Sequence, residues 1–292
     1  MNQTGEKWEL IFVDDGSTDG STDSIRELAQ QDDRVRPVIF ARNFGHQIAV
    51  TAGMDYSRGQ AVVIIDADLQ DPPELIPEMA ARWKAGAQVV YGQRRKRAGE
   101  SRFKELTARW YYRVLRRLAG DAFPEDTGDF RLADRAVVDV VTSMPEHARY
   151  LRGMFSWAGF RQEALPYDRD ARFAGQTHYP LKKMLRLAAN GILSFSEKPL
   201  LWPLWCGLIW LAVAVGMVVK LLVRHLLGWS NAALLVPFLL VLGIGSVLVS
   251  LGILGAYLAR VYEEVKGRPL YVVARTVGFS QPPPIDKARI KA

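Results

Sequence analysis

The chain has 292 residues and a net charge of +7, and 24% of its residues are charged while 49% are apolar or aromatic. This balance is typical of a globular protein and excludes a wholly disordered or collagen-like chain. Its single cysteine, Cys206, excludes a disulfide framework and a cysteine-based zinc site. The basic residues gather beside apolar or amphipathic segments, which favours anionic head groups or phosphorylated substrates, and no nucleic acid, as partners.

Strands and helices alternate through the first 91 residues. Apolar runs predict strands at 8–13, 35–40, 61–65 and 88–91, and helical spacing predicts helices at 19–30, 47–57 and 73–85. Such alternation predicts an α/β fold with a parallel sheet that is covered on both faces. Ligands of these sheets bind beyond the carboxyl ends of the strands, so we expect Asp14-Asp15, Arg42 and residues 66–70 to face one cleft.

Two basic amphipathic segments follow. Residues 101–118 place five apolar side chains on one side of a predicted helix and basic residues elsewhere, and residues 179–195 resemble them. Such helices lie in the head-group plane of a membrane with basic residues toward phosphates. A helix packed on the sheet with a solvated basic face is an equally good interpretation of residues 101–118.

The last third of the chain contains two apolar stretches. Residues 200–219 and 226–259 have no charged side chain, and each is long enough to span a membrane as a helix. Lys and Arg are more frequent before the first stretch and after the second than between them, so both ends are predicted to be cytoplasmic. Residues 1–8 lack an apolar signal-peptide core, and the tail from Val277 is predicted to be disordered.

The most informative pattern is Ile65-Asp66-Ala67-Asp68-Leu69-Gln70-Asp71, which places two carboxylates two residues apart after an apolar strand. Mg²⁺ prefers oxygen ligands and usually takes one or two carboxylates together with substrate phosphates. The pattern therefore favours a nucleoside diphosphate held through a metal ion. An acidic loop that caps a helix is the alternative interpretation.

Several motifs together resemble glycosyltransferase family 2. They are Phe12 to Ser21, Arg42 to Gly45, Asp66 to Pro73, Tyr91 to Arg94 and Gly128 to Leu132, and the apolar C-terminal hairpin is similar to that of bacterial members. The resemblance is to the polyprenol-phosphate branch, which includes dolichol-phosphate mannose synthase and undecaprenyl-phosphate glucosyltransferases. It implies a GT-A type, Rossmann-like sheet followed by two transmembrane helices.

The resemblance also implies roles for residues on the donor side. Asp14, Asp15, Arg42, Asp66 and Arg94 would bind the nucleotide-sugar, with Asp15 at the base or ribose. Mg²⁺ or Mn²⁺ would lie on the diphosphate, and its ligands would be Asp66, Asp68 and Gln70. The ion would neutralise charge on the departing nucleoside diphosphate. The alternative for Arg94 is membership of a solvated basic run.

On the acceptor side, Asp129 and Arg131 match the catalytic acidic and basic positions of the family. Asp129 is the usual candidate base. A phosphate monoester is already largely ionised at neutral pH, since its second pKa is about 6, so Asp129 would equally serve to orient the sugar or the acceptor. The lipid phosphate would be bound by basic side chains, namely Arg94, Arg131, Arg172 and His178.

The sequence departs from the family at two places. Family members begin with a further strand and a Pro-x-Tyr-Asn-Glu-like loop, whereas only 13 residues precede Asp14 here, so the sheet is expected to be N-terminally truncated. The loss of a central strand would leave its neighbours with unpaired backbone groups. The family's Gly-x-Ser/Thr-Lys turn ends in His178 instead of lysine.

These observations predict a glycosyltransferase domain at 1–177, a juxtamembrane amphipathic segment at 178–199, a transmembrane hairpin at 200–259 and a cytoplasmic tail at 260–292. The expected activity is the inverting transfer of one sugar from a nucleotide-sugar to polyprenyl (undecaprenyl) phosphate at the cytoplasmic face of the bacterial inner membrane. UDP-glucose is the first candidate donor and GDP-mannose the second, with UDP-N-acetylhexosamines open, and a homo-oligomer is possible. The alternatives are a processive polysaccharide synthase and a membrane protein that has lost nucleotide binding.

Overall fold

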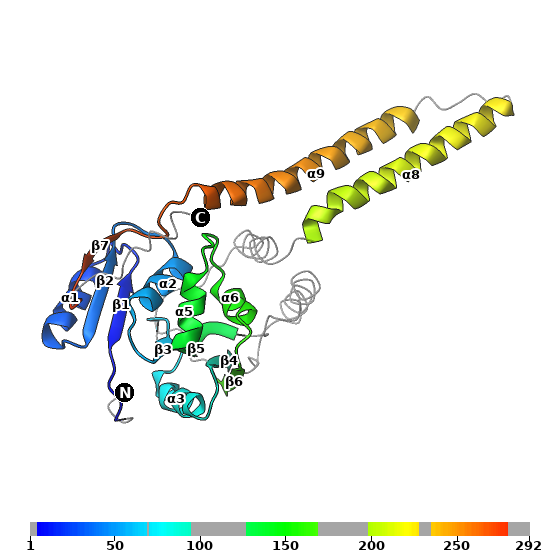
Figure 1. The fold of residues 1–292 in the computed structure, drawn as a ribbon. Helices are drawn as coiled ribbons and strands as arrows, with labels where there is room; N and C mark the ends of the chain where they lie inside the picture. Colours follow the sequence, from blue (N-terminus) through cyan, green and yellow to red (C-terminus); the bar gives the residue numbers. More distant parts are fainter. Residues whose placement is uncertain (1–4, 69, 95–126, 169–197, 228–234, 280–292) are drawn as a thin grey trace. The chain divides into compact units, whose positions relative to one another are not determined.

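The computed structural model describes residues 5–68, 70–94, 127–168, 198–227 and 235–279 (Figure 1). The described residues form two units. Residues 5–168 and 267–279 form the catalytic unit, and residues 198–266 form a helical hairpin. Residues 101–118 and 179–195, which were predicted to be amphipathic helices, lie outside the described residues.

The first sheet of the catalytic unit has the strand order β1-β2-β7. Its strands are β1 (Leu10–Asp14), β2 (Val35–Phe40) and β7 (Val273–Thr276). β1 and β2 are parallel, with Leu10 opposite Val35, and β7 runs antiparallel to β2. Helix α1 (Ser21–Gln31) connects β1 to β2, and α2 (His46–Tyr56) packs on β1. Most of β2 is buried, which explains its nearly continuous apolar sequence.

The second sheet has the order β3-β5-β4-β6. Its strands are β3 (Ala61–Ile64), β4 (Val89–Arg94), β5 (Thr127–Asp134) and β6 (Gln162–Tyr167), and its helices are η2 (Pro73–Leu75), α3 (Ile76–Lys84), α5 (Arg135–Ser143) and α6 (Leu151–Trp157). Asp134 is the N-cap of α5, because its Oδ1 accepts the N–H of Ala136 at 2.9 Å. Its Oδ2 accepts the indole N–H of Trp83 at 2.7 Å and so ties α3 to the same point.

The α/β class and the order of the first seven elements are confirmed, but the prediction of a wholly parallel sheet is wrong. β5 lies between β3 and β4 and is antiparallel to both, while only the β1–β2 and β4–β6 pairs are parallel. In the sequence, β5 follows β4 after a segment long enough to allow either direction, because only a tight hairpin forces consecutive strands to be antiparallel. The alternation of strands and helices in the first 91 residues gives no information on the direction of β5.

The two sheets end in strands that are not paired with each other. Among the described residues, β1 pairs only with β2 and β3 pairs only with β5. On one face the sheets are nevertheless linked, since α2 packs on β1, α5 packs on β3, and the two helices contact each other. β1 and β3 are thus edge strands of their sheets among the described residues.

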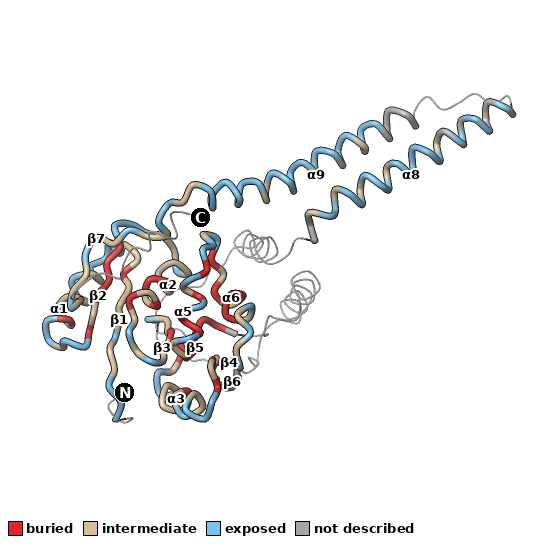
Figure 2. Tube along the Cα trace, in the orientation of Figure 1, coloured by how far each residue is buried: buried red, intermediate tan, exposed pale blue. Residues whose placement is uncertain are grey.

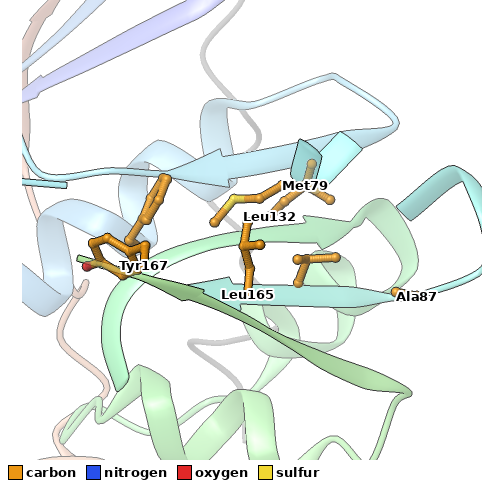
Figure 3. Packing of buried hydrophobic residues seen from close by; sticks show 7 residues of the cluster. Met79, Ala87, Leu132, Leu165 and Tyr167 are labelled. Carbon is orange, nitrogen blue, oxygen red and sulfur yellow. The ribbon is translucent and has the colours of Figure 1, made fainter. Parts of the chain in front are cut away.

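The core of the second sheet lies between its strands and α3 (Figure 3). Seven buried residues form it: Met79, Ala87, Val90, Phe130, Leu132, Leu165 and Tyr167. Gly92 lies under this cluster, and a Cβ there would lie 2.8 Å from the Tyr167 ring and 2.9 Å from the Phe130 ring. Only glycine lets β4 run beneath these two aromatic rings.

The segment after the helical hairpin belongs to the catalytic unit. β7 completes the first sheet, and Tyr271 stacks on Phe40 with ring centroids 5.1 Å apart. Phe279 packs edge-on against Tyr56, and the N–H of Val277 donates to the carbonyl of Pro37 at 3.1 Å. The prediction that disorder begins at Val277 is therefore wrong for residues 277–279, while residues 280–292 lie outside the described residues.

The second unit consists of α8 (Lys198–Leu226) and α9 (Leu235–Val265), which contact each other. Within them, residues 200–224 and 240–265 are long and apolar enough to cross a membrane. Large apolar residues along both helices are exposed. Figure 2 colours most of the described residues of α8 and α9 as exposed. α9 continues past residue 259, where the sequence analysis ended the hairpin.

Candidate active site

The first part of the site is the turn that follows β1. Asp14 is buried, its Oδ1 accepts the N–H of Ser17 at 2.8 Å, and its Oδ2 accepts the hydroxyl of Thr22. Burial raises the pKa of Asp14, but the hydrogen bonds from Thr22 and Ser17 outweigh it, so the pKa lies below its usual value. Asp14 is thus an ionised carboxylate that fixes the turn.

Asp15 joins this turn to the loop that follows β2. Its Oδ1 accepts the N–H of Phe44 at 2.6 Å and its Oδ2 accepts the N–H of Gly45 at 2.9 Å. The two loops touch closely at Gly16, which has φ of 71°, because a Cβ there would lie 2.6 Å from the carbonyl carbon of Arg42. A carboxylate has about four acceptor sites, so Asp15 can hold this loop and still accept from a ligand hydroxyl.

Arg42 lies exposed on the second loop. Its guanidinium is 4.0 Å from the centroid of the Phe44 ring, and its Nη1 donates to the carbonyl of Asn43 at 3.0 Å. The ring holds the side chain in place without covering its charge. The arrangement presents a positive group on the loop that Asp15 holds.

The third loop carries the acidic pair. Asp68 Oδ1 accepts the N–H of Gln70 at 3.1 Å, and the hydroxyl of Tyr167 donates to the fully buried Asp71. Burial raises the pKa of Asp66; the nearby His46 lowers it, and the carboxylates of Asp129, Asp71 and Asp68 raise it further. The net shift of the pKa is upward, chiefly because of burial, and a bound cation would stabilise the ionised form of Asp66.

These oxygen donors fit a divalent metal ion. Within the described ranges, no three His, Cys, Asp or Glu side chains are grouped as a complete set of ligands. An ion held by Asp66 and Asp68, with Gln70 beside them, would therefore need further oxygens from substrate phosphates or water, which is how Mg²⁺ is usually bound.

Asp129, on β5, is the centre of the densest cluster of hydrogen bonds in the site. His46 Nε2 donates to its Oδ2 at 2.9 Å, Gln47 Nε2 donates to the same oxygen at 3.2 Å, and Arg152 Nε donates to its Oδ1 at 2.9 Å. Burial raises the pKa of Asp129, but the hydrogen bond from His46 and the charge of Arg152 outweigh it, and the pKa lies far below its usual value. The side chain is 8% exposed.

His46 connects this cluster with the acidic loop. Its Nε2 is also 3.7 Å from Asp66 Oδ1, and half of its side chain is exposed. The hydrogen bond to Asp129 raises the pKa of the imidazole, and burial opposes this shift. A single imidazole thus stands between the carboxylate of the metal motif and the carboxylate of the predicted acceptor loop.

Arg131 is buried behind this cluster. Its Nη2 donates to the carbonyl of Gly128 at 3.1 Å, and its guanidinium lies 4.5 Å from the centroid of the Phe155 ring. Burial lowers the pKa of Arg131 to about 10, against the opposing charge of Asp129. The side chain remains cationic at neutral pH and supports the turn that carries Asp129.

The structure brings most of the predicted residues together in two groups. The Asp14–Asp15 turn lies on the Arg42 loop, and Asp66 and Asp129 meet at His46. The side chain of Arg94 lies outside the described side chains, although its backbone ends β4, and Arg172 and His178 lie outside the described residues. Their predicted roles stay predictions.

Sequence reasoning missed three polar residues of the site: His46, Gln47 and Arg152. His46 directly follows the Arg42–Gly45 motif, so its position beside a recognised loop was an available signal. Gln47 is on the first turn of the same helix. Nothing near Arg152 in the sequence marks it, because its partner Asp129 is 23 residues away.

Comparisons with known proteins identify the family. The family model described as Glycosyl transferase family 2 matches residues 1–142. An uncharacterized glycosyltransferase, YkcC of Bacillus subtilis, is 49% identical over 285 residues, which are 96% of this chain and 87% of that protein. The chain belongs to glycosyltransferase family 2.

Two further relatives carry more specific names. A prophage bactoprenol glucosyl transferase homolog of Escherichia coli is 38% identical, with 91% of this chain and 88% of that protein covered. The bactoprenol glucosyl transferase of Shigella phage SfII is 37% identical, with 92% and 87% covered. This family 2 chain is accordingly a glycosyltransferase, and its family is commonly dependent on a divalent metal.

Proposed function

We propose that this family 2 glycosyltransferase moves one glucosyl residue from UDP-glucose to undecaprenyl phosphate with inversion at the anomeric carbon. The observation that carries the proposal is the meeting of the metal-motif carboxylate and the acceptor-loop carboxylate at His46, with distances of 3.7 and 2.9 Å. A donor diphosphate at the first carboxylate and an acceptor at the second would then be neighbours. The names of the phage-derived relatives support glucose and a bactoprenol acceptor; GDP-mannose is the second candidate donor.

On the donor side, Asp14, Asp15 and Arg42 would hold the nucleotide. Asp15 presents acceptor oxygens for ribose hydroxyls while it fixes the loop of Arg42. Asp66, Asp68 and Gln70 would hold Mg²⁺ or Mn²⁺, which supplies neutralisation of the charge that develops on the leaving diphosphate. Arg94 would add a positive charge at the end of β4.

On the acceptor side, Asp129 and Arg131 would form the wall of the site, with Arg172 and His178 at the lipid phosphate. The acceptor phosphate oxygen attacks the anomeric carbon as the bond from that carbon to the nucleoside diphosphate breaks. The attacking oxygen is already ionised at neutral pH, so no proton has to be removed from it. Inversion follows from one displacement.

The hairpin would place this reaction at a membrane. The resemblance and the distribution of Lys and Arg around α8 and α9 support two spans with both termini cytoplasmic, in the inner membrane of a bacterium. The exposed apolar side chains of both helices are suited to lipid. The long apolar tail of a polyprenyl phosphate would lie in the same bilayer.

The test is transfer of radiolabelled sugar by the purified full chain in detergent. UDP-glucose, GDP-mannose and UDP-N-acetylglucosamine are each offered with undecaprenyl phosphate and Mg²⁺, and lipid-linked sugar is separated by extraction. We expect glucose to be transferred, and the anomeric configuration of the product to be opposite to that of the donor. Transfer from another donor alone would refute the sugar assignment. Absence of transfer from all three would favour a protein without catalytic activity.

A further inference from the structure

Arg152 covers the carboxylate of Asp129. It is the second residue of α6, and its Nε and Nη2 lie 2.9 and 3.5 Å from the two carboxylate oxygens. The Arg152 side chain is 32% exposed, whereas that of Asp129 is 8% exposed. The Arg152 guanidinium is therefore the more exposed member of this pair, and a ligand that approaches Asp129 from the side of α6 meets Arg152.

The remaining partners of Asp129 make it a fixed hydrogen-bond acceptor. His46 and Gln47 donate to it from the first turn of α2. Gln47 also accepts the N–H of Leu151 through its Oε1 at 2.9 Å, which fixes the residue just before Arg152. Asp129 thus ties the start of α2 to the start of α6. A carboxylate with this many donors is suited to orienting cationic groups and poorly suited to accepting a proton.

The other arginine of the site is differently placed. Arg131 is buried and donates to backbone carbonyls of Gly128 and Asp129. Arg152 is partly exposed at the same carboxylate. A guanidinium presents its N–H donors in a planar fork that matches the oxygens of a phosphate. Of these two arginines, Arg152 is the one that the geometry presents to a ligand.

We infer that Arg152 binds the phosphate of the polyprenyl phosphate acceptor and that Asp129 is the residue that positions it, not a base. This inference rests on the proposed function and names a binding residue for its acceptor. His46, on the other side of Asp129, then separates the acceptor phosphate from the donor diphosphate near Asp66. Cationic or hydrogen-bonding groups between two phosphate sites reduce their mutual repulsion.

The experiment measures steady-state kinetics of the full chain with Arg152→Gln, Arg152→Lys and Asp129→Asn. Arg161→Gln removes an exposed positive charge from the segment after α6 and is the matched control. We expect Arg152→Gln to raise the KM for undecaprenyl phosphate by roughly 10- to 100-fold while the KM for UDP-glucose changes less than about twofold. Arg152→Lys keeps the charge without the fork and should fall between.

Asp129→Asn should raise the same acceptor KM, and the double variant should be no worse than Arg152→Gln, because the two residues act as one unit. A large loss of kcat in Asp129→Asn with an unchanged acceptor KM would show that Asp129 acts as a base, and it would overturn the inference. An unchanged acceptor KM in both Arg152 variants would overturn it as well.

Binding is also measured without transfer, as the rise in unfolding temperature on addition of farnesyl phosphate. Wild type and Arg161→Gln should be stabilised and Arg152→Gln should not, even if it unfolds at a lower temperature. Equal stabilisation of all three would overturn the assignment of Arg152. Absence of sugar transfer by the wild type, with farnesyl phosphate binding that depends on Arg152, would count against the proposed function alone.

Discussion

Tyr271 provides a direct test of the finding that the segment after the helical hairpin is part of the catalytic unit. Its hydroxyl donates to Asp55 Oδ2 at 2.9 Å, and its ring stacks on Phe40 with the ring planes 16° apart. Phe40 is 3% exposed, so this contact is internal to the first sheet. Replacing Tyr271 by alanine removes both of these interactions next to β7.

The size of the effect follows from these contacts. A hydrogen bond to a partly exposed carboxylate contributes about 1 kcal/mol and an aromatic pair about 0.5 to 1.5 kcal/mol. With the loss of half-buried apolar area, Tyr271→Ala should cost about 2 to 4 kcal/mol. In a unit of this size, 1 kcal/mol corresponds to about 2 to 4 °C in Tm. We expect a decrease of roughly 4 to 15 °C for Tyr271→Ala and about 2 to 4 °C for Tyr271→Phe.

The assay is thermal unfolding of the full chain in detergent, followed by limited proteolysis at each temperature. Tyr262 is the control, because it is exposed on α9 and Tyr262→Ala should change the stability of the catalytic unit by less than about 0.5 kcal/mol. If Tyr271→Ala and wild type lose the catalytic unit at the same temperature, the segment 267–279 does not stabilise that unit, and its pairing with β2 has no energetic weight.

Four further predictions concern the site and the membrane. Asp68→Ala should abolish transfer and leave membrane insertion intact, and activity near wild type in saturating Mg²⁺ would remove the metal assignment. His46→Ala should lower kcat/KM by roughly tenfold or more, since it removes a hydrogen bond to a buried carboxylate worth about 1.5 kcal/mol, and His46→Gln should recover part of it; equal rates for all three would contradict this. The pKa of Asp129 is depressed in the folded protein, so its ionised carboxylate stabilises the fold above its unfolded pKa of about 3.9. This stabilisation is lost as the pH falls through and below that value. The difference in stability between wild type and Asp129→Asn should therefore shrink from about pH 5 downward. Protease added outside intact cells should leave the N-terminal half uncut, and cleavage there would overturn the predicted topology.

The parts of the fold that the sequence predicts are those set by local pattern. Residues 35–40 are a strand in both the prediction and the structure. A short run that is mostly apolar and β-branched or aromatic is typical of a buried strand. Helix α2 lies within one residue of its predicted start and end, since Gly45 and the apolar spacing after it mark it locally. Its Gly45 has φ of 100°, a conformation that favours glycine at this junction.

The parts that were missed depend on partners distant in the sequence. The direction of β5 is set by its pairing with β3 and β4, and no residue within β5 distinguishes a parallel from an antiparallel neighbour. Residues 273–276 form β7 through antiparallel pairing with β2, a partner that is distant in the sequence. Tyr271 and Phe279 then find apolar partners more than 200 residues earlier in the chain.

The site shows the same division between loops that are recognisable and contacts that are not. Asp15 holds the N–H groups of Phe44 and Gly45, and the next residue, His46, reaches Asp129, which in turn holds Arg152. This series of hydrogen bonds joins the turn after β1 to α6 through the first turn of α2. Each sequence motif can be recognised by itself, but only the fold shows that the motifs are connected through the first turn of α2. A ligand that displaces the loop at Asp15 would therefore change the position of His46, and through it the pair of Asp129 and Arg152, so donor binding and acceptor binding are expected to be coupled through α2.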